Sequence, residues 1–203
     1  MNEAQLIEGL QNLGTSNNAK GELAFKYIVT NYQSIIYNTS LGIVGNTNDA
    51  KDIAQDVFVQ LYRSASTFRG DSKISTWLYR IAVNKSLNHI RNNKKHNVVL
   101  SIHGSGKNSS NEIREIQIKD QANINPEQIT EQNDHKKALR IAIDSLAKNQ
   151  KTAFVLKNYD NCSYKEITEI MGMSLSSVES LIHRAKKNLQ KSLRYYYETN
   201  VRK

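Results

Sequence analysis

A long polar stretch in the middle of the chain constrains its fold more than any other feature. Residues 96–133 are rich in Asn, Ser, Gly and Gln, have a weak apolar pattern and contain the single proline, Pro126. Most connections inside a compact domain have about 4–6 residues, so this segment is too long for an ordinary loop. The sequence therefore predicts two separate lobes, 1–95 and 134–203, joined by a flexible linker over 96–133.

The segments on either side of this stretch have the periodicity of α-helices. Apolar residues recur every three or four positions, and no segment has the sustained alternation that is typical of strands. Hydrophobic residues make up 38% of the chain, which is low for one large core. We therefore expect an all-α protein built from two modest helical units.

Charge and composition narrow the partners and the compartment. The net charge of +9 and the pI of about 9.5 indicate a polyanionic partner, either nucleic acid or a membrane surface. The one cysteine, Cys162, excludes an internal disulfide framework and fits a reducing compartment. No apolar run approaches the roughly 18 residues needed to cross a membrane, and the N-terminus lacks the features of a signal peptide. We therefore expect a cytoplasmic protein without membrane insertion.

Three aspartates lie at the spacing i, i+3, i+7 on a predicted amphipathic helix that begins at residue 49 and ends near residue 64. Asp49, Asp52 and Asp56 share one face of this helix, and Asn48 or Asp49 is expected to cap its N-terminus. Such an acidic ridge is usually a solvated face or a protein-contact surface, and we predict no metal site here.

A second helix, from about residue 75 to residue 95, carries a narrow polar face beside a broad apolar one, and Ser72 is a candidate N-cap for it. At about 100° per residue, the narrow face is formed by Trp77, Arg80, Asn84, Asn88, Arg91 and Lys95. Arg and Lys can bind phosphates, Asn can bind base edges or backbone, and an aromatic ring can stack on a base. This face predicts a nucleic-acid contact. A packed Trp77 beside an ordinary solvated face is the alternative.

Residues 163–190 have the pattern of a helix-turn-helix. Gly172 would end the first helix, and Ser174 would cap the second. The second helix would bury Val178, Ile182, Ala185 and Leu189 and expose Ser176, Ser180, His183, Arg184 and Lys187. Small polar residues allow close approach to a major groove, and basic ones reach bases and phosphates. The pattern predicts duplex DNA binding, with an ordinary helical hairpin as the alternative.

No pattern predicts catalysis. His183 has no partner Cys or His at metal-ligand spacing, which excludes a zinc site there. The sequence contains no Gly-rich phosphate loop and no recognisable pairing of a nucleophile with a base. We therefore expect a protein that is not an enzyme and has no metal and no cofactor.

Taken together and in this order, the motifs resemble those of ECF-type sigma factors of the sigma-70 superfamily. The stretch "DAKDIAQDVFVQLYRS" is similar to sigma region 2.2, and "FRGDSKISTWLYRIAVNKSLNHIRNNKK" is similar to regions 2.3 and 2.4. The stretch "KNQKTAFVLKNYDNCSYKEITEIMGMSLSSVESLIHRAKKNL" is similar to region 4. The resemblance covers roughly residues 22–95 and 136–191. It implies core RNA polymerase and promoter DNA as partners, and an anti-sigma factor as a further possible partner.

The resemblance also implies roles for particular residues. Polymerase docking would involve Asp49, Asp52, Gln55 and Asp56. Contact with the melted −10 strand, including a pocket for an extruded base, would involve Phe68, Arg69, Asp71, Ser72, Lys73, Trp77, Arg80, Asn84, Asn88 and Arg91. The −35 duplex would be contacted by Ser176, Ser177, Glu179, Ser180, His183, Arg184 and Lys187.

One position departs from the family pattern. Some members carry Arg where this chain has Glu179, so the −35 preference of those members does not transfer to it. The rival hypothesis is a stand-alone helix-turn-helix transcriptional regulator, which would bind duplex DNA by itself and would need no acidic docking helix.

Overall fold

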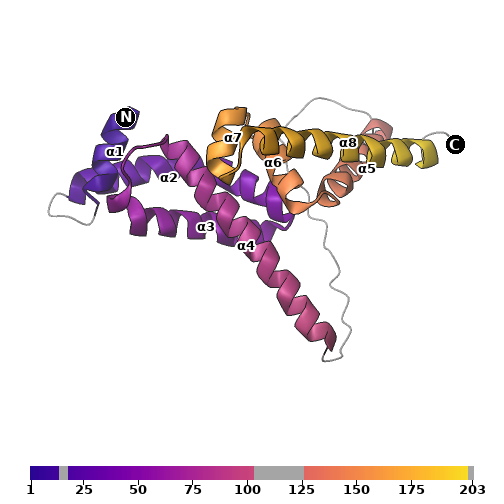
Figure 1. The fold of residues 1–203 in the computed structure, drawn as a ribbon, viewed down its shortest axis with the longest axis horizontal. Coiled ribbons are helices and arrows are strands. Elements are labelled where there is room, and N and C mark those ends of the chain that lie inside the picture. Colours follow the sequence, from indigo (N-terminus) through magenta and orange to yellow (C-terminus); the bar gives the residue numbers. More distant parts are fainter. Residues whose placement is uncertain (14–17, 103–125, 201–203) are drawn as a thin grey trace.

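The computed structural model describes residues 1–13, 18–102 and 126–200. The regular elements in these ranges are all helical, which confirms the predicted all-α class (Figure 1). They are α1 (Glu3–Gln11), α2 (Asn18–Val44), α3 (Thr47–Ser64), the short 3₁₀ helix η1 (Ala65–Thr67), α4 (Ile74–Ile102), α5 (Pro126–Asp144), α6 (Lys148–Asn158), α7 (Tyr164–Met171) and α8 (Leu175–Asn200). We call α1 to α4 the first lobe and α5 to α8 the second lobe.

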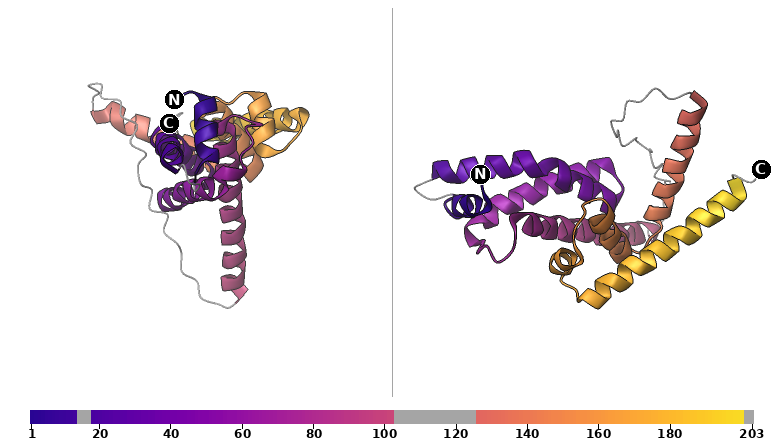
Figure 2. Two further views of the ribbon diagram at one scale, coloured as in Figure 1. Left: turned by 90° about the vertical axis from the view of Figure 1, so that its left-hand side faces the viewer. Right: turned by 90° about the horizontal axis from the view of Figure 1, so that it is seen from above.

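Helices α4 and α5 extend into the segment that the sequence predicts as a linker. Helix α4 continues to Ile102, and its C-terminal part projects away from the other helices (Figures 1 and 2). Helix α5 begins at Pro126, where a proline needs no backbone N–H partner. Residues 103–125 of the predicted linker lie outside the described residues, and the domain boundaries stay a prediction.

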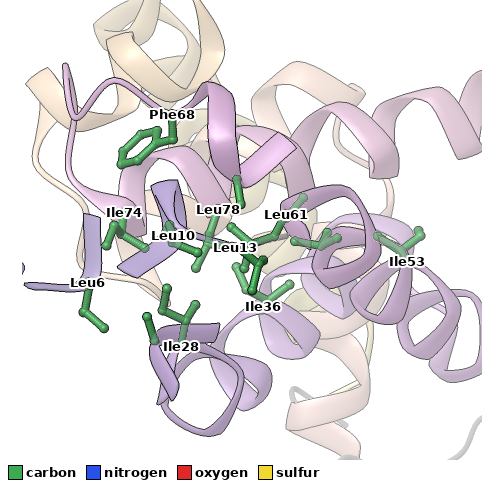
Figure 3. Packing of buried hydrophobic residues seen from close by; sticks show 14 residues of the cluster. Leu6, Leu10, Leu13, Ile28, Ile36, Ile53, Leu61, Phe68, Ile74 and Leu78 are labelled. Carbon is green, nitrogen blue, oxygen red and sulfur yellow. The ribbon is translucent and has the colours of Figure 1, made fainter. Parts of the chain in front are cut away.

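The first lobe is held together by apolar side chains from all four of its helices (Figure 3). Leu10, Ile28, Leu61 and Leu78 each come from a different helix, and none of them is exposed to solvent. Burying a side chain of this size contributes roughly 1.5–3 kcal/mol. This core fixes α3 against α4, and therefore fixes the acidic face of one helix relative to the polar face of the other.

Helix α1 is an element that the sequence interpretation did not assign. Its N-terminus forms a capping box in which Asn2 and Gln5 exchange hydrogen bonds of 2.9 and 3.0 Å. Leu6, Leu10 and Leu13 from this region are buried in the first lobe.

The second lobe contains the helix-turn-helix that the sequence predicts. Helix α7 ends at Gly172, whose left-handed φ of 63° suits a residue without a Cβ. Ser174 then accepts a hydrogen bond of 3.3 Å from the Ser177 N–H at the start of α8. Both capping predictions for this motif are confirmed. The buried stripe of α8 is also confirmed, and it comprises Val178, Ile182, Ala185 and Leu189.

The sequence interpretation expected two separate lobes. In the structure the two lobes pack against each other. Ile43 from α2 and Val83 from α4 belong to the same buried cluster as Val155, Ile167 and residues of α8. Part of the apolar face of α4 therefore packs on the second lobe rather than on the other helices of the first. Gly42 allows this close approach, since a Cβ at Gly42 would lie 3.0 Å from Val155 Cγ1.

One predicted helix cap is wrong. The N-cap of α3 is Asn46, whose side chain accepts hydrogen bonds from the N–H groups of Asn48 and Asp49 at 2.8 and 3.1 Å. Asn48 and Asp49, which were expected to cap this helix, are instead in its first turn. Asp49 remains in a favourable position there, because a negative charge near a helix N-terminus interacts well with the helix dipole.

Candidate nucleic-acid and polymerase interfaces

The polar face predicted on α4 is present and has two different parts. Arg80, Asn84, Asn88 and Arg91 are exposed along this face. Trp77, at its N-terminal end, is partly buried and packs against the core of the first lobe. Lys95 lies outside the residues whose side chains the structure describes. The exposed part offers amide and guanidinium groups in successive turns, which suits an extended phosphate backbone with unpaired bases.

The loop before α4 is anchored by α1. Gln11 donates a hydrogen bond of 3.1 Å from its side chain to the Phe68 carbonyl, and the Phe68 ring stacks on Trp77 with 4.4 Å between ring centroids. Phe68 is buried in this conformation, whereas Arg69, Asp71 and Lys73 of the same loop are exposed.

The predicted cap of α4 is also wrong. Helix α4 begins at Ile74, and the Ile74 N–H donates a hydrogen bond of 2.9 Å to the Glu3 carboxylate from α1 rather than to Ser72. Glu3 and Gln11 therefore position the loop and were missed by the sequence interpretation. The signal that could have found them is the capping box at the N-terminus followed by leucines at a helical spacing.

The second lobe covers the N-terminal end of this polar face. Lys73 forms an ion pair of 3.0 Å with Glu166 of α7. Arg80 donates two hydrogen bonds, of 3.1 and 2.8 Å, to the carbonyl of Glu169. The pKa of Glu166 is lowered to about 2, because the Ser163 backbone N–H donates to its carboxylate and Lys73 lies beside it. Two cations predicted for the DNA strand thus face α7 in this arrangement.

The acidic face of α3 is partly paired with α4. Asp49 lies 3.0 Å from the His89 ring, and Asp56 lies 3.2 Å from Lys85. Asp52 and Gln55 are exposed on the same helix. Gln55 also lines a groove of about 330 Å³ between α2 and α3, together with Val29, Gln33, Ser34, Tyr37, Lys51, Ala54 and Phe58. The face thus combines carboxylates with an adjacent partly apolar groove.

The recognition surface predicted on α8 is exposed throughout. Ser176, Ser177, Glu179, Ser180, His183, Arg184 and Lys187 all face solvent. Ser176, Ser177, Ser180 and Arg184 also line a groove of about 480 Å³ that is completed by Asn149, Met173 and Leu181. The side chains that line the groove at the N-terminal end of the helix are short, so a nucleic-acid backbone or base edge can approach closely.

Within the described residues, no group of three His, Cys, Asp or Glu side chains is placed to hold a metal ion. The described helices include none with the length and apolarity to span a bilayer. The exposed face of α8 and the polar face of α4 together define the class: a helical protein with a helix-turn-helix and a second, partly covered cationic surface suited to nucleic acid.

Comparisons with known proteins agree with this class. The family described as Sigma-70 region 2 matches residues 28–96, and the family described as Sigma-70, region 4 matches residues 136–189. The ECF RNA polymerase sigma factor SigW of Bacillus subtilis is 33% identical over 171 residues, which cover 84% of this chain and 89% of SigW. The ECF RNA polymerase sigma-E factor of Escherichia coli K12 is 31% identical over 166 residues, which cover 80% of this chain and 83% of that protein.

Solved structures share the fold at lower sequence identity. RpoE from Bartonella quintana, in complex with the anti-sigma factor NepR, has a TM-score of 0.64 at 19% identity and covers 84% of this chain and 96% of its own. CnrH, in complex with the cytosolic domain of CnrY, has a TM-score of 0.63 at 19% identity and covers 95% of this chain and 97% of its own.

The chain belongs to the sigma-70 family of RNA polymerase sigma factors, in its ECF group. As a sigma factor, it acts in transcription initiation with core RNA polymerase and promoter DNA. A stand-alone helix-turn-helix regulator is not favoured, since a Sigma-70 region 2 match precedes the helix-turn-helix in this chain.

Proposed function

We propose that this sigma factor uses three separate surfaces during initiation. The face of α3 with Asp49, Asp52, Gln55 and Asp56 docks on core polymerase. The exposed face of α8 contacts the duplex at the −35 element. The polar face of α4 and the loop before it hold the melted −10 strand. The observation that carries this assignment is that most side chains of the three sets are exposed, on α3, on α8, and on α4 with the loop before it.

The division of labour follows from the chemistry of each surface. The α8 surface offers short hydroxyl side chains at one end and His183, Arg184 and Lys187 further along, which suits a groove bounded by phosphates. The α4 surface offers amides and guanidinium groups, which can bond the exposed edges of unpaired bases. Docking through α3 relies on the carboxylates and on the groove beside Gln55.

The protein supplies positioning rather than a reaction. Sigma factors generally act as DNA-binding regulators, and we infer that this chain likewise has no catalytic activity and no cofactor. Nucleotide addition then belongs to the polymerase, and the chain works in the cytoplasm, where that enzyme is. RpoE is bound to the anti-sigma factor NepR, and CnrH is bound to the cytosolic domain of CnrY. These two complexes support regulation of this chain by a protein that binds it.

Site-specific photo-crosslinking in the initiation complex tests the three assignments together. Probes replace Asp52, Asn84 and Ser180 one at a time, and a probe at Glu22 on α2 is the control outside the three surfaces. We expect Asp52 to crosslink to a polymerase subunit, Asn84 to the nontemplate strand near −10, and Ser180 to the −35 duplex. Crosslinks from Asn84 that map to double-stranded DNA upstream would refute the strand assignment.

A further inference from the structure

The contact between the two lobes contains a carboxylate with an unusual partner. Asp160, in the loop between α6 and α7, reaches across to Thr39 on α2. Both oxygens of the Asp160 carboxyl group lie 3.0 Å from the Thr39 hydroxyl. The same hydroxyl lies 2.9 Å from the Ile35 carbonyl one turn earlier in α2. Thr39 is fully buried, so water does not complete this arrangement from its side.

The number of protons at this contact depends on the ionisation of Asp160. A hydroxyl group carries one hydrogen, yet Thr39 has the Ile35 carbonyl and two carboxyl oxygens within hydrogen-bonding distance. If Asp160 is ionised, one neutral hydroxyl is its only side-chain donor among the described hydrogen bonds. If Asp160 is protonated, it donates to Thr39, and Thr39 donates to Ile35. In the protonated form Thr39 therefore bonds both Asp160 and Ile35, whereas in the ionised form its one hydrogen must be shared between the carboxylate and the Ile35 carbonyl.

The surroundings give an ionised Asp160 little compensation. None of the ion pairs between described residues involves Asp160. The nearby Tyr79 phenol on α4 and Cys162 thiol in the same loop both have pKa values raised mainly by burial, so both are neutral near pH 7. Asp160 is partly buried, and even partial burial of a carboxylate without a cation is costly.

The other charged groups around the loop have partners of their own. Lys157 on α6 donates to the Cys162 carbonyl at 3.3 Å, and Glu166 on α7 pairs with Lys73. The Tyr32 phenol on α2 contributes to the raised pKa of Tyr79, and the pKa of Tyr32 is itself raised mainly by burial. None of these groups provides a positive charge next to Asp160.

We propose that the Asp160–Thr39 contact is a proton-dependent latch: it holds the second lobe against α4 while Asp160 is protonated and weakens when Asp160 ionises. In the closed arrangement, Lys73 and Arg80 are occupied by α7. The consequence for transcription rests on the proposed function, since the released cations are those assigned to the −10 strand. The opening of the lobes does not depend on that assignment.

The direction of the pH response follows from proton linkage. In the closed arrangement burial raises the pKa of Asp160 from 3.8 to about 7, although the hydrogen bond from Thr39 acts in the opposite direction. Once the lobes separate, solvent restores an ordinary value. Closure is therefore most stable below the pKa of the open form and is lost progressively as pH rises toward the pKa of the closed form. Linkage changes the closed-to-open ratio by about tenfold per pH unit in that window, or roughly a hundredfold between pH 5 and pH 8.

Zero-length carbodiimide crosslinking of the full chain measures closure directly. The Lys73–Glu166 pair joins the lobes at 3.0 Å, and the Lys85–Asp56 pair lies within the first lobe at 3.2 Å. The ratio of the two crosslinked peptides, read by mass spectrometry, reports closure and reduces the effect of pH on the reagent. The experiment is also run in a Gly42→Ala background. The added methyl group crowds Val155 of the second lobe and destabilises the closed arrangement. If the unsubstituted chain is almost fully closed, this background brings the closed-to-open ratio into the measurable range.

The matched variant is Asp160→Asn, which keeps the shape and a donor for Thr39 but cannot ionise. We expect the crosslink ratio of the unsubstituted chain to fall between pH 5 and pH 8 relative to Asp160→Asn, in at least one of the two backgrounds. Thr39→Val should lower the ratio at pH 5, because the hydrogen bond is lost, but should keep its pH dependence, because burial and not Thr39 raises the pKa of Asp160. Equal pH profiles for the unsubstituted chain and the Asp160→Asn variant in both backgrounds would overturn the latch.

Run-off transcription with core polymerase then separates the latch from its consequence. If the closed arrangement blocks the strand-binding surface, Asp160→Asn should lower promoter opening at pH 8 more than at pH 6. A chain that shows the crosslinking response without this transcriptional difference would keep the latch and refute its link to the −10 surface. Failure of the α4 assignment alone would leave the crosslink ratios unchanged.

Discussion

Replacing Glu3 with Ala should loosen the loop that precedes the strand-binding face of α4. The Glu3 carboxylate accepts a hydrogen bond of 2.9 Å from the Ile74 N–H, the first helical residue of α4. Glu3 lies in α1, 71 positions before Ile74 in the sequence. The bond is therefore a tertiary contact that serves as a helix cap. No local side chain replaces it, because the nearby Ser72 does not bond this N–H.

The magnitude follows from what the variant removes. Loss of a capping side chain costs about 1 kcal/mol, in a range of roughly 0.5–2 kcal/mol. A loss of about 1 kcal/mol lowers the melting temperature of a chain this size by roughly 2–4 °C. It also raises the equilibrium population of the open Ile74 amide about fivefold. The neighbouring bond from Gln11 to Phe68 remains, so the loop should loosen at one end only.

Hydrogen exchange of the Ile74 amide and a thermal melt by circular dichroism measure the two effects. The matched control is Glu8→Ala, which removes another carboxylate of α1. Glu8 pairs with Lys20 at 3.7 Å, and both side chains are about two-thirds exposed, so the change should be within a few tenths of a kcal/mol. Unchanged exchange at Ile74 in Glu3→Ala, or an equal effect in Glu8→Ala, would contradict the tertiary cap.

Three further predictions test the proposed surfaces. Asp52→Lys should weaken core polymerase binding several-fold in a titration while circular dichroism shows an intact fold, since Asp52 is exposed and none of the described ion pairs involves it; unchanged affinity would remove Asp52 from the docking surface. Arg184→Ala should relax preference at one −35 position by about 1–3 kcal/mol, whereas Lys187→Ala should weaken binding evenly across a base-substitution series. Asn84→Ala should reduce permanganate reactivity of the −10 thymines, with a loss of about 1 kcal/mol per missing bond; wild-type reactivity would show that Asn84 does not hold the strand.

Local motifs were predictable because their determinants lie close together in sequence. The turn of the helix-turn-helix follows from Gly172 and Ser174, and the buried stripe of α8 follows from apolar residues at a helical spacing. The exposed part of the α4 face was predictable for the same reason. Periodicity alone fixes which residues share a face of a helix.

The partners of each face were not predictable in this way. The two lobes were expected to be separate, yet Val83 of α4 packs against the second lobe. The acidic ridge of α3 was recognised, but its spacing could not reveal that His89 and Lys85 approach it from α4. The cap by Glu3 was missed because it joins distant positions. A sequence pattern states that a face is apolar or charged, and tertiary packing decides what covers it.

The closed arrangement also makes DNA binding a competition within one chain. The Glu166 carboxylate lies against Lys73, where the proposed function places a phosphate, and the carbonyl of Glu169 occupies the guanidinium of Arg80. If only a fraction of molecules is open, the apparent affinity for the melted strand is reduced by that fraction. A substitution that separates the lobes without touching α4, such as Gly42→Leu against Val155, should therefore raise the apparent affinity for a −10 single strand. Loss of Asn84 should lower the affinity in both backgrounds, because that residue lies outside the covered end of the face. If Gly42→Leu raises this affinity and loss of Asn84 lowers it, the α4 face binds the strand and is covered in the closed arrangement. If neither substitution changes the affinity, the α4 face does not bind the strand.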